Sequence, residues 1–167
     1  RVEFRAEDFY VRPGNPDDSG RVTHARTTPV AGISYAPHAD LRLYASYGRG
    51  FETPTFNELG YRADGGAGLA LELMPATSDH VELGAKWRRG DGAWLELAAF
   101  QVDTDDELAV ARNVGGRASF RNVGRTRRAG VEVAAQLPLS DHWSATLAYT
   151  RLQAQFRDAF ALCSGAG

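Results

Sequence analysis

Cysteine and long apolar segments are nearly absent from this chain of 167 residues. Its one cysteine, Cys163, builds neither a disulfide framework nor a zinc site, although it could pair with a cysteine outside the chain. No stretch approaches the roughly 18 consecutive apolar residues of a membrane helix. The formal net charge of −2 offers no basic field for phosphates, which disfavours nucleic acid as a partner. The protein class must therefore be inferred from the pattern of residues.

The sequence also lacks the residue groupings of common enzymes and metal sites. Ser164 has no Gly-x-Ser-x-Gly turn around it, and no nucleophile is paired with a base. The four histidines are far apart in sequence and lack ligand spacing. The acidic run at 103–107 lacks the glycine and the distant glutamate of an EF-hand loop. We therefore expect no catalytic residue, no metal site and no cofactor.

Alternation of apolar and polar side chains is the strongest signal present, and it predicts β-strands. In the segment 41–48, Leu41, Leu43, Ala45 and Tyr47 would share one face, and polar or small residues the other. The pattern predicts about seven strands, at residues 2–10, 27–35, 41–47, 81–88, 93–110, 129–137 and 143–150. The second faces of these strands carry charges that no dry core would accept, namely Glu82, Lys86, Glu96, Arg128 and Glu132.

The connections between these strands alternate between short and long. Turns at 36–40, 89–92 and 138–142 are short, whereas loops at 11–26, 51–77 and around 112–119 are longer. Outer-membrane barrels have short periplasmic turns and long extracellular loops, and their polar lumen keeps the mean hydropathy low. The sequence therefore predicts an all-β fold, an antiparallel up-and-down transmembrane β-barrel with charged side chains facing the lumen.

Aromatic and basic residues fit this orientation. Tyr47, Trp87 and Trp143 lie near strand ends, where aromatic rings meet lipid headgroups. Arg125 and Arg127 share the phase of the lipid-facing row, so we expect both to lie beyond its apolar part.

Three segments resemble a known family, the TonB-dependent receptors of the bacterial outer membrane. The first runs Tyr47-Gly-Arg-Gly-Phe-Glu-Thr-Pro-Thr-Phe-Asn-Glu-Leu59, and the second runs Leu73-Met-Pro-Ala-Thr-Ser-Asp-His-Val-Glu-Leu-Gly-Ala-Lys86. The family commonly has Glu where Ala76 stands. The third is Phe120-Arg-Asn-Val-Gly-Arg-Thr-Arg-Arg-Ala-Gly-Val-Glu-Val133, which is similar to the family's Asn-x-Gly and Gly-x-Glu pattern.

This resemblance implies a barrel of about 22 strands in the outer membrane of a Gram-negative bacterium. Such a barrel is filled by an N-terminal plug and imports scarce solutes, most often ferric siderophores, with energy from the TonB-ExbB-ExbD system. Residues 1–167 would be a partial barrel domain, without the plug and without the TonB box. Because about seven strands cannot close a barrel, we expect the chain to be truncated at both ends, with the tail 159–167 in an extracellular loop.

Ligand contacts are expected in the long loops, not on the strands. Tyr61 and Arg62, or Arg112, Arg117 and Arg121, could hold an anionic or aromatic solute by charge and stacking. The charged lumen residues are expected to contact the plug or to pair with one another.

Two other interpretations stay open at this point. The chain could be a complete small outer-membrane barrel of about eight strands with a structural role. It could also be a soluble β-barrel that binds a small ligand in its interior.

Overall fold

Ten strands and one short helix make up the computed structural model, which describes residues 1–14, 17–66 and 68–159. The elements are β1 (Val2–Ala6), β2 (Gly20–His24), β3 (Val30–His38), β4 (Leu41–Glu52), α1 (Phe56–Leu59), β5 (Ala76–Arg88), β6 (Trp94–Asp105), β7 (Leu108–Val114), β8 (Arg117–Asn122), β9 (Thr126–Ser140) and β10 (Trp143–Phe156). The tail that we assigned to a loop, with Cys163, lies almost wholly outside the described residues. No helix of the described residues is long and apolar enough to cross a membrane.

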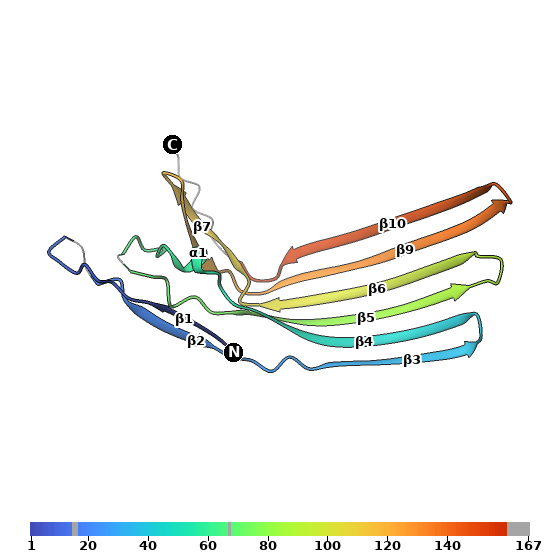
Figure 1. Ribbon diagram of the computed structural model, residues 1–167, viewed down its shortest axis with the longest axis horizontal. Coiled ribbons are helices and arrows are strands. Elements are labelled where there is room, and N and C mark those ends of the chain that lie inside the picture. The colour runs from blue at the N-terminus through green and yellow to red at the C-terminus, as the bar shows by residue number, and fades with distance from the viewer. Residues whose placement is uncertain (15–16, 67, 160–167) are drawn as a thin grey trace.

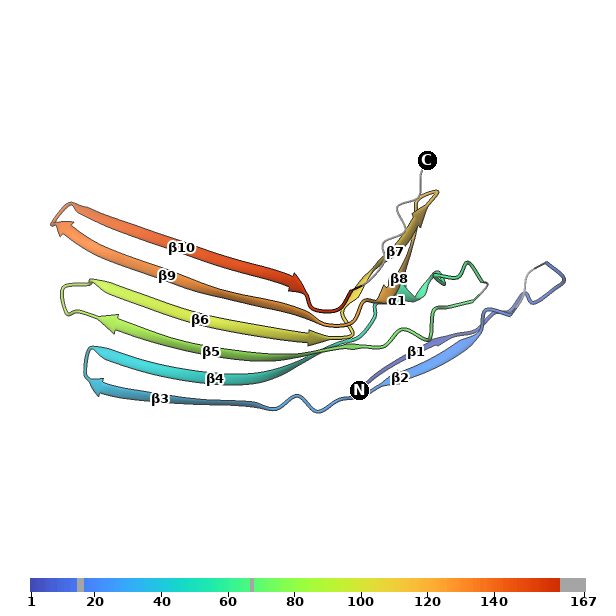
Figure 2. The same cartoon turned by 180° about the vertical axis from the view of Figure 1, so that it is seen from behind.

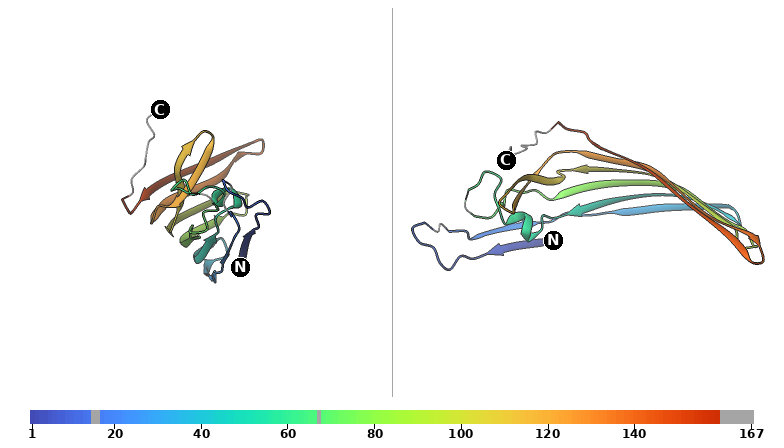
Figure 3. Two further views of the ribbon diagram at one scale, coloured as in Figure 1. Left: turned by 90° about the vertical axis from the view of Figure 1, so that its left-hand side faces the viewer. Right: turned by 90° about the horizontal axis from the view of Figure 1, so that it is seen from above.

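Six strands form one antiparallel sheet in the order β10-β9-β6-β5-β4-β3 (Figure 1). The strands are long and run side by side, and the sheet bends along their length (Figure 3). Two small hairpins, β1-β2 and β7-β8, stand apart from it. Within the described part of the chain the sheet stays open, because β3 and β10 each pair with one neighbour. The predicted all-β, antiparallel and incomplete sheet is confirmed.

Short and long connections separate cleanly to opposite ends of this sheet. The turns β3-β4, β5-β6 and β9-β10 lie together at one end (Figure 2). Both small hairpins and α1 lie at the other end, which we call the long-loop end (Figures 1 and 2). The predicted alternation is therefore confirmed, as an up-and-down path requires.

Strand register collects the apolar side chains on one face of the sheet, here called the outer face. One row crosses all six strands and contains Tyr35, Leu43, Ala85, Leu97, Val133 and Tyr149. Large side chains on this face are exposed, and Leu83 and Leu147 have 57% and 58% of their surface accessible. Such a continuous exposed apolar surface requires an apolar environment, which a bilayer supplies.

The apolar band runs obliquely across the strands. Tyr35 is the large apolar residue of β3 nearest the short turn, whereas Tyr149 is the last apolar outer residue of β10 before Arg151. Both nevertheless lie in the same row of paired residues. A band that stays level in a membrane must cross the rows in this way when strands tilt by roughly 35–45°.

The opposite face, here called the inner face, carries the charges. Register places Glu82, Lys86, Glu96, Arg128 and Glu132 on it, as predicted. The Lys86 Nζ lies 3.2 Å from Glu96 Oε2, so part of the charge is paired within the sheet. The polar atoms on the inner face therefore need water or protein beside them. The apolar side chains of the outer face need neither.

Tyr44 lies flat across the inner face over Gly84, its partner on β5. Its hydroxyl donates a hydrogen bond to Glu82 at 2.5 Å, which holds the ring in this position. Any side chain at position 84 would collide with that ring, because a Cβ there would overlap its outer atoms. Gly84 is thus required by a close approach, as glycine in a strand often is.

The structure corrects several predicted elements. The single strand expected at 93–110 is two strands, β6 and β7, separated at Asp106, which has φ 57°. The loops expected at 11–26 and 112–119 contain β2 and most of the β7-β8 hairpin. The first strand ends at Ala6, not at residue 10, and α1 was not predicted. These strands are short and pair only locally, so no buried face imposes a clear alternation on them.

Substitution of Gly84 by Val tests the packing of Tyr44. We expect Gly84→Val to destabilise the intact receptor by about 1–3 kcal/mol, because the ring must leave its place over the strand. Gly90→Val is the matched control, since nothing lies within 4 Å of a Cβ at that turn position. Thermal unfolding in detergent measures the difference, and equal stability of the two variants would contradict the packing argument.

Candidate functional site

The connection between β4 and β5 is anchored at its start by a short capped helix. Thr55 caps α1 and forms a capping box with Glu58, in which the Glu58 N–H donates to Thr55 Oγ1 at 3.3 Å. Pro54 is fully buried beside this cap, and Leu59 at the helix end has no exposed surface. The family-like segment from Tyr47 to Leu59 therefore ends in a buried, capped helix that fixes the start of the β4-β5 connection.

A small apolar core joins the parts of the long-loop end. Its buried members are Leu59, Ala70 and Leu73, all from the β4-β5 connection. Phe4 of β1, Leu108 of β7 and Phe120 of β8 pack against them. Burial of these side chains holds both hairpins and the connection together, at about 25 cal/mol per Å² of apolar surface removed from water.

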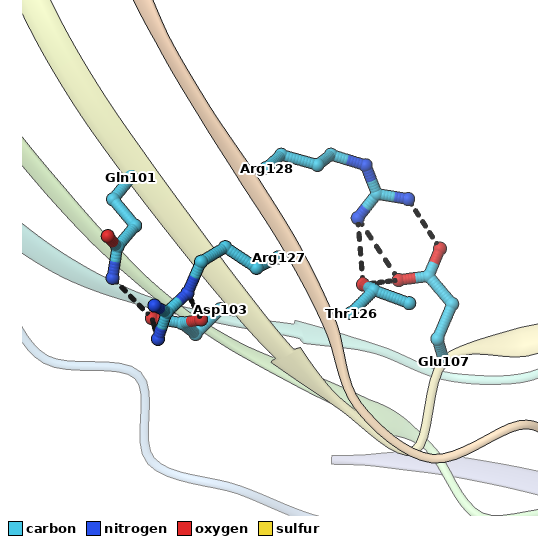
Figure 4. A network of polar contacts seen from close by, with 6 residues as sticks. All are labelled: Gln101, Asp103, Glu107, Thr126, Arg127 and Arg128. Atoms are coloured by element: carbon cyan, nitrogen blue, oxygen red, sulfur yellow. Dashed lines mark hydrogen bonds and ion pairs between the residues drawn. The ribbon is translucent and has the colours of Figure 1, made fainter. Parts of the chain in front are cut away.

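The base of the β7-β8 hairpin is tied to β9 by backbone and side chain. The Val123 N–H donates to Glu107 O at 2.8 Å, and the Glu107 N–H donates to Gly124 O at 3.1 Å. Arg128 Nη2 lies 2.7 Å from Glu107 Oε1, and Thr126 Oγ1 donates to Glu107 Oε2 at 2.8 Å. This hydrogen bonding to Arg128 lowers the pKa of Glu107 below its ordinary value. Figure 4 shows Glu107, Thr126 and Arg128 together on one side of β9.

Ion pairs line the outer face where the apolar band ends. Arg127 Nε lies 2.5 Å from Asp103 Oδ1 on the other side of β9 (Figure 4). Arg49 pairs with Asp79 at 3.0 Å, and Arg125 pairs with Asp158 at 2.8 Å. Both Arg125 and Arg127 lie beyond Ala129, the last apolar outer residue of β9, where we expected them.

Four of the five predicted ligand residues line one hollow at the long-loop end. Its volume is about 400 Å³, and its lining includes Tyr61, Arg62, Arg112 and Arg117. The β4-β5 connection supplies Tyr61 and Arg62, whereas β7 and β8 supply Arg112 and Arg117. Arg121, the fifth candidate, is not among the lining residues.

Lining residues that sequence reasoning missed are Ala63, Gly65, Gly66, Val114 and Ser119. The Gly65-Gly66 pair was the available signal, because a loop without side chains leaves room beside Arg62.

The charges in the hollow are unequally paired. Arg62 is 2.8 Å from Asp64, which lowers the pKa of Asp64 to about 2 through that hydrogen bond. The Arg117 guanidinium lies 5.4 Å from the centre of the Tyr61 ring, which is a cation–π distance. Within the described part of the chain, neither Arg112 nor Arg117 forms an ion pair. Two unpaired guanidinium groups beside an aromatic ring suit a planar anionic ligand.

A family model described as TonB dependent receptor-like, beta-barrel, matches residues 2–164. Among curated proteins, the probable TonB-dependent receptor BfrD of Bordetella pertussis is 29% identical over 124 residues. That alignment covers 74% of this chain and 16% of the relative, so the chain spans a small part of the relative's length.

Solved structures also have similar folds, and two of them serve as examples. The siderophore receptor PirA from Pseudomonas aeruginosa has a TM-score of 0.65 at 21% identity, over 83% of this chain and 30% of that one. The copper transporter OprC has a TM-score of 0.63 at 20% identity, over 75% of this chain and 20% of that one. At such identities the likeness is one of fold.

Protonation of Glu107 should loosen the hairpin base. Because its pKa is lowered in the folded state, its stabilising effect is complete above the ordinary value of 4.5 and is lost as pH falls through the lowered value. We expect the Val123 amide to lose protection from hydrogen exchange over that acidic range. In Glu107→Gln, the Val123 amide should exchange faster than in wild type already near neutral pH, and its exchange should show no further loss of protection as the pH falls. Glu7→Gln, in the β1-β2 region, should behave as wild type. An unchanged loss of protection at acidic pH in Glu107→Gln would disprove the assignment.

Proposed function

This chain belongs to the TonB-dependent receptor β-barrel family, and on that premise we propose that the intact protein imports a ferric siderophore across the outer membrane. The chain forms part of the barrel wall of such a receptor, which is a transporter and not an enzyme. The remaining strands and the plug would come from other parts of the same protein. The complete small barrel and the soluble ligand-binding barrel are disfavoured by the family match over almost the whole chain.

The two-faced sheet is the observation that carries this proposal. An exposed apolar face opposite a charged face suits a wall between lipid and a polar interior. Its oblique apolar band is what tilted membrane strands require. The outer face would contact outer-membrane lipid. Inner-face charges such as Glu132 would contact the plug, through which the TonB-ExbB-ExbD system would act.

The hollow supports a chelate as the cargo in preference to a bare metal ion. Guanidinium groups of Arg112 and Arg117 repel free cations and attract oxygen anions. A ferric siderophore of the catecholate or carboxylate type presents such oxygens around the metal. Tyr61 adds an aromatic face on which a planar ligand group can stack.

Removal of both unpaired arginines tests the cargo. We expect Arg112→Ala/Arg117→Ala in the intact receptor to weaken binding of an anionic ferric catecholate by about tenfold or more, a loss of about 1.4 kcal/mol. Arg89→Ala at a short turn removes one positive charge from the opposite end of the sheet and should leave the affinity unchanged. Fluorescence quenching titration measures both affinities. Equal binding by all three proteins would exclude the hollow as a cargo site, and a wild-type receptor that takes up no ferric siderophore would refute the proposed import.

Adjacent positions on β6 test which face meets lipid. Leu97 lies on the outer face and Ala98 on the inner face. We expect Leu97→Arg to destabilise the receptor by about 2–4 kcal/mol, because a charge in the middle of the apolar band would face hydrocarbon. Ala98→Arg should cost less, since that side chain faces the interior. Unfolding by denaturant in lipid vesicles measures both, and the reverse order would overturn the orientation.

A further inference from the structure

Asn122, at the end of β8, joins the two long connections through a single side chain. Its Oδ1 accepts a hydrogen bond from the Met74 N–H at 2.9 Å. Its Nδ2 donates to Met74 O at 2.9 Å and to Asp106 O at 2.7 Å. Both amide protons and the amide oxygen are thus used, and every partner is a backbone group at least 16 residues from Asn122 in sequence.

Each partner of Asn122 belongs to a segment that carries one side of the hollow. Met74 closes the β4-β5 connection, which carries Tyr61 and Arg62. Asp106 opens the β6-β9 connection, which carries Arg112 and Arg117. The side chain therefore links the bases of both sides, although Asn122 is not among the residues that line the hollow.

We propose that Asn122 is a positioning residue for the hollow, holding its two sides at the separation at which one anionic ligand contacts both. This inference rests on the proposed function, because it concerns the affinity of the same site. Asn122 acts through Arg112 and Arg117 and does not touch the ligand.

The link that the Asn122 side chain makes between Met74 and Asp106, here called the clamp, requires an amide. An aspartate at position 122 has the same shape and keeps an acceptor for the Met74 N–H. It cannot donate, so the Met74 and Asp106 carbonyl groups would each face a carboxylate oxygen and lose a partner. The two connections would then separate at their bases while the apolar core and the barrel strands stay in place.

Asn122→Asp in the intact receptor is the direct test, with a ferric tris-catecholate chelate as the probe. We expect its affinity to fall about tenfold, with an unchanged unfolding temperature of the barrel. Asn57→Asp is the matched control, because Asn57 is exposed in the β4-β5 connection and its side chain forms no hydrogen bond among the described residues. An Asn122→Asp receptor that binds the chelate like wild type would overturn the proposal.

A double-mutant cycle separates positioning from a general structural role. In the Arg112→Ala/Arg117→Ala background, Asn122→Asp should cause no further loss, because the groups it positions are gone. An equal loss in both backgrounds would show an independent structural effect and overturn the proposal.

Hydrogen exchange without ligand keeps this test distinct from that of the proposed function. The Met74 amide and the amides of 108–122 should exchange faster in Asn122→Asp than in wild type. If wild type binds no anionic chelate, the proposed cargo fails, and unchanged exchange in the variant would overturn the clamp separately.

Discussion

Backbone hydrogen bonding between neighbouring strands is the constraint on which the rest of this structure depends. In a bilayer no water can satisfy a free N–H or C=O group, so each long strand must pair along its length. Pairing fixes the register, and register decides which side chains share a row. The row from Tyr35 to Tyr149 is apolar on all six strands because each strand contributes a residue of the same phase.

Outside the apolar band, backbone groups are not confined to pairing within the sheet. Water can satisfy the backbone there, so short local hairpins become possible. They are held by a small core around Leu59, by the Glu107 and Arg128 ion pair and by the Asn122 side chain. The family-like segments lie mostly at this boundary. Pro54 and Thr55 follow β4, and Asn122 and Gly124 precede β9. At Gly124 the chain turns with φ 83°, a conformation that favours glycine.

Strands in the main sheet were predictable because each has a face of its own. Leu41 to Tyr47 alternates cleanly, and the structure extends that strand to Glu52. The weakly phased segment at 93–110 was predicted wrongly as one strand, because it contains both β6 and the start of β7. Glu107 falls within the single strand predicted there, yet it pairs with Arg128 of β9, which lies 21 residues further along the chain. Of the candidate ligand residues, residue type and loop position indicated Tyr61, Arg62, Arg112 and Arg117, but not their common hollow.

By itself, the sequence determined the fold class, the two faces of the sheet and the alternation of short and long connections. These features follow from local periodicity and turn-forming residues, which act over a few neighbours. Only the tertiary structure decided that Arg112 and Arg117 lie opposite Tyr61 and that Asn122 links both segments. Those contacts join residues far apart in the chain. They depend on the small core and on the geometry at the end of the sheet, which no local pattern encodes.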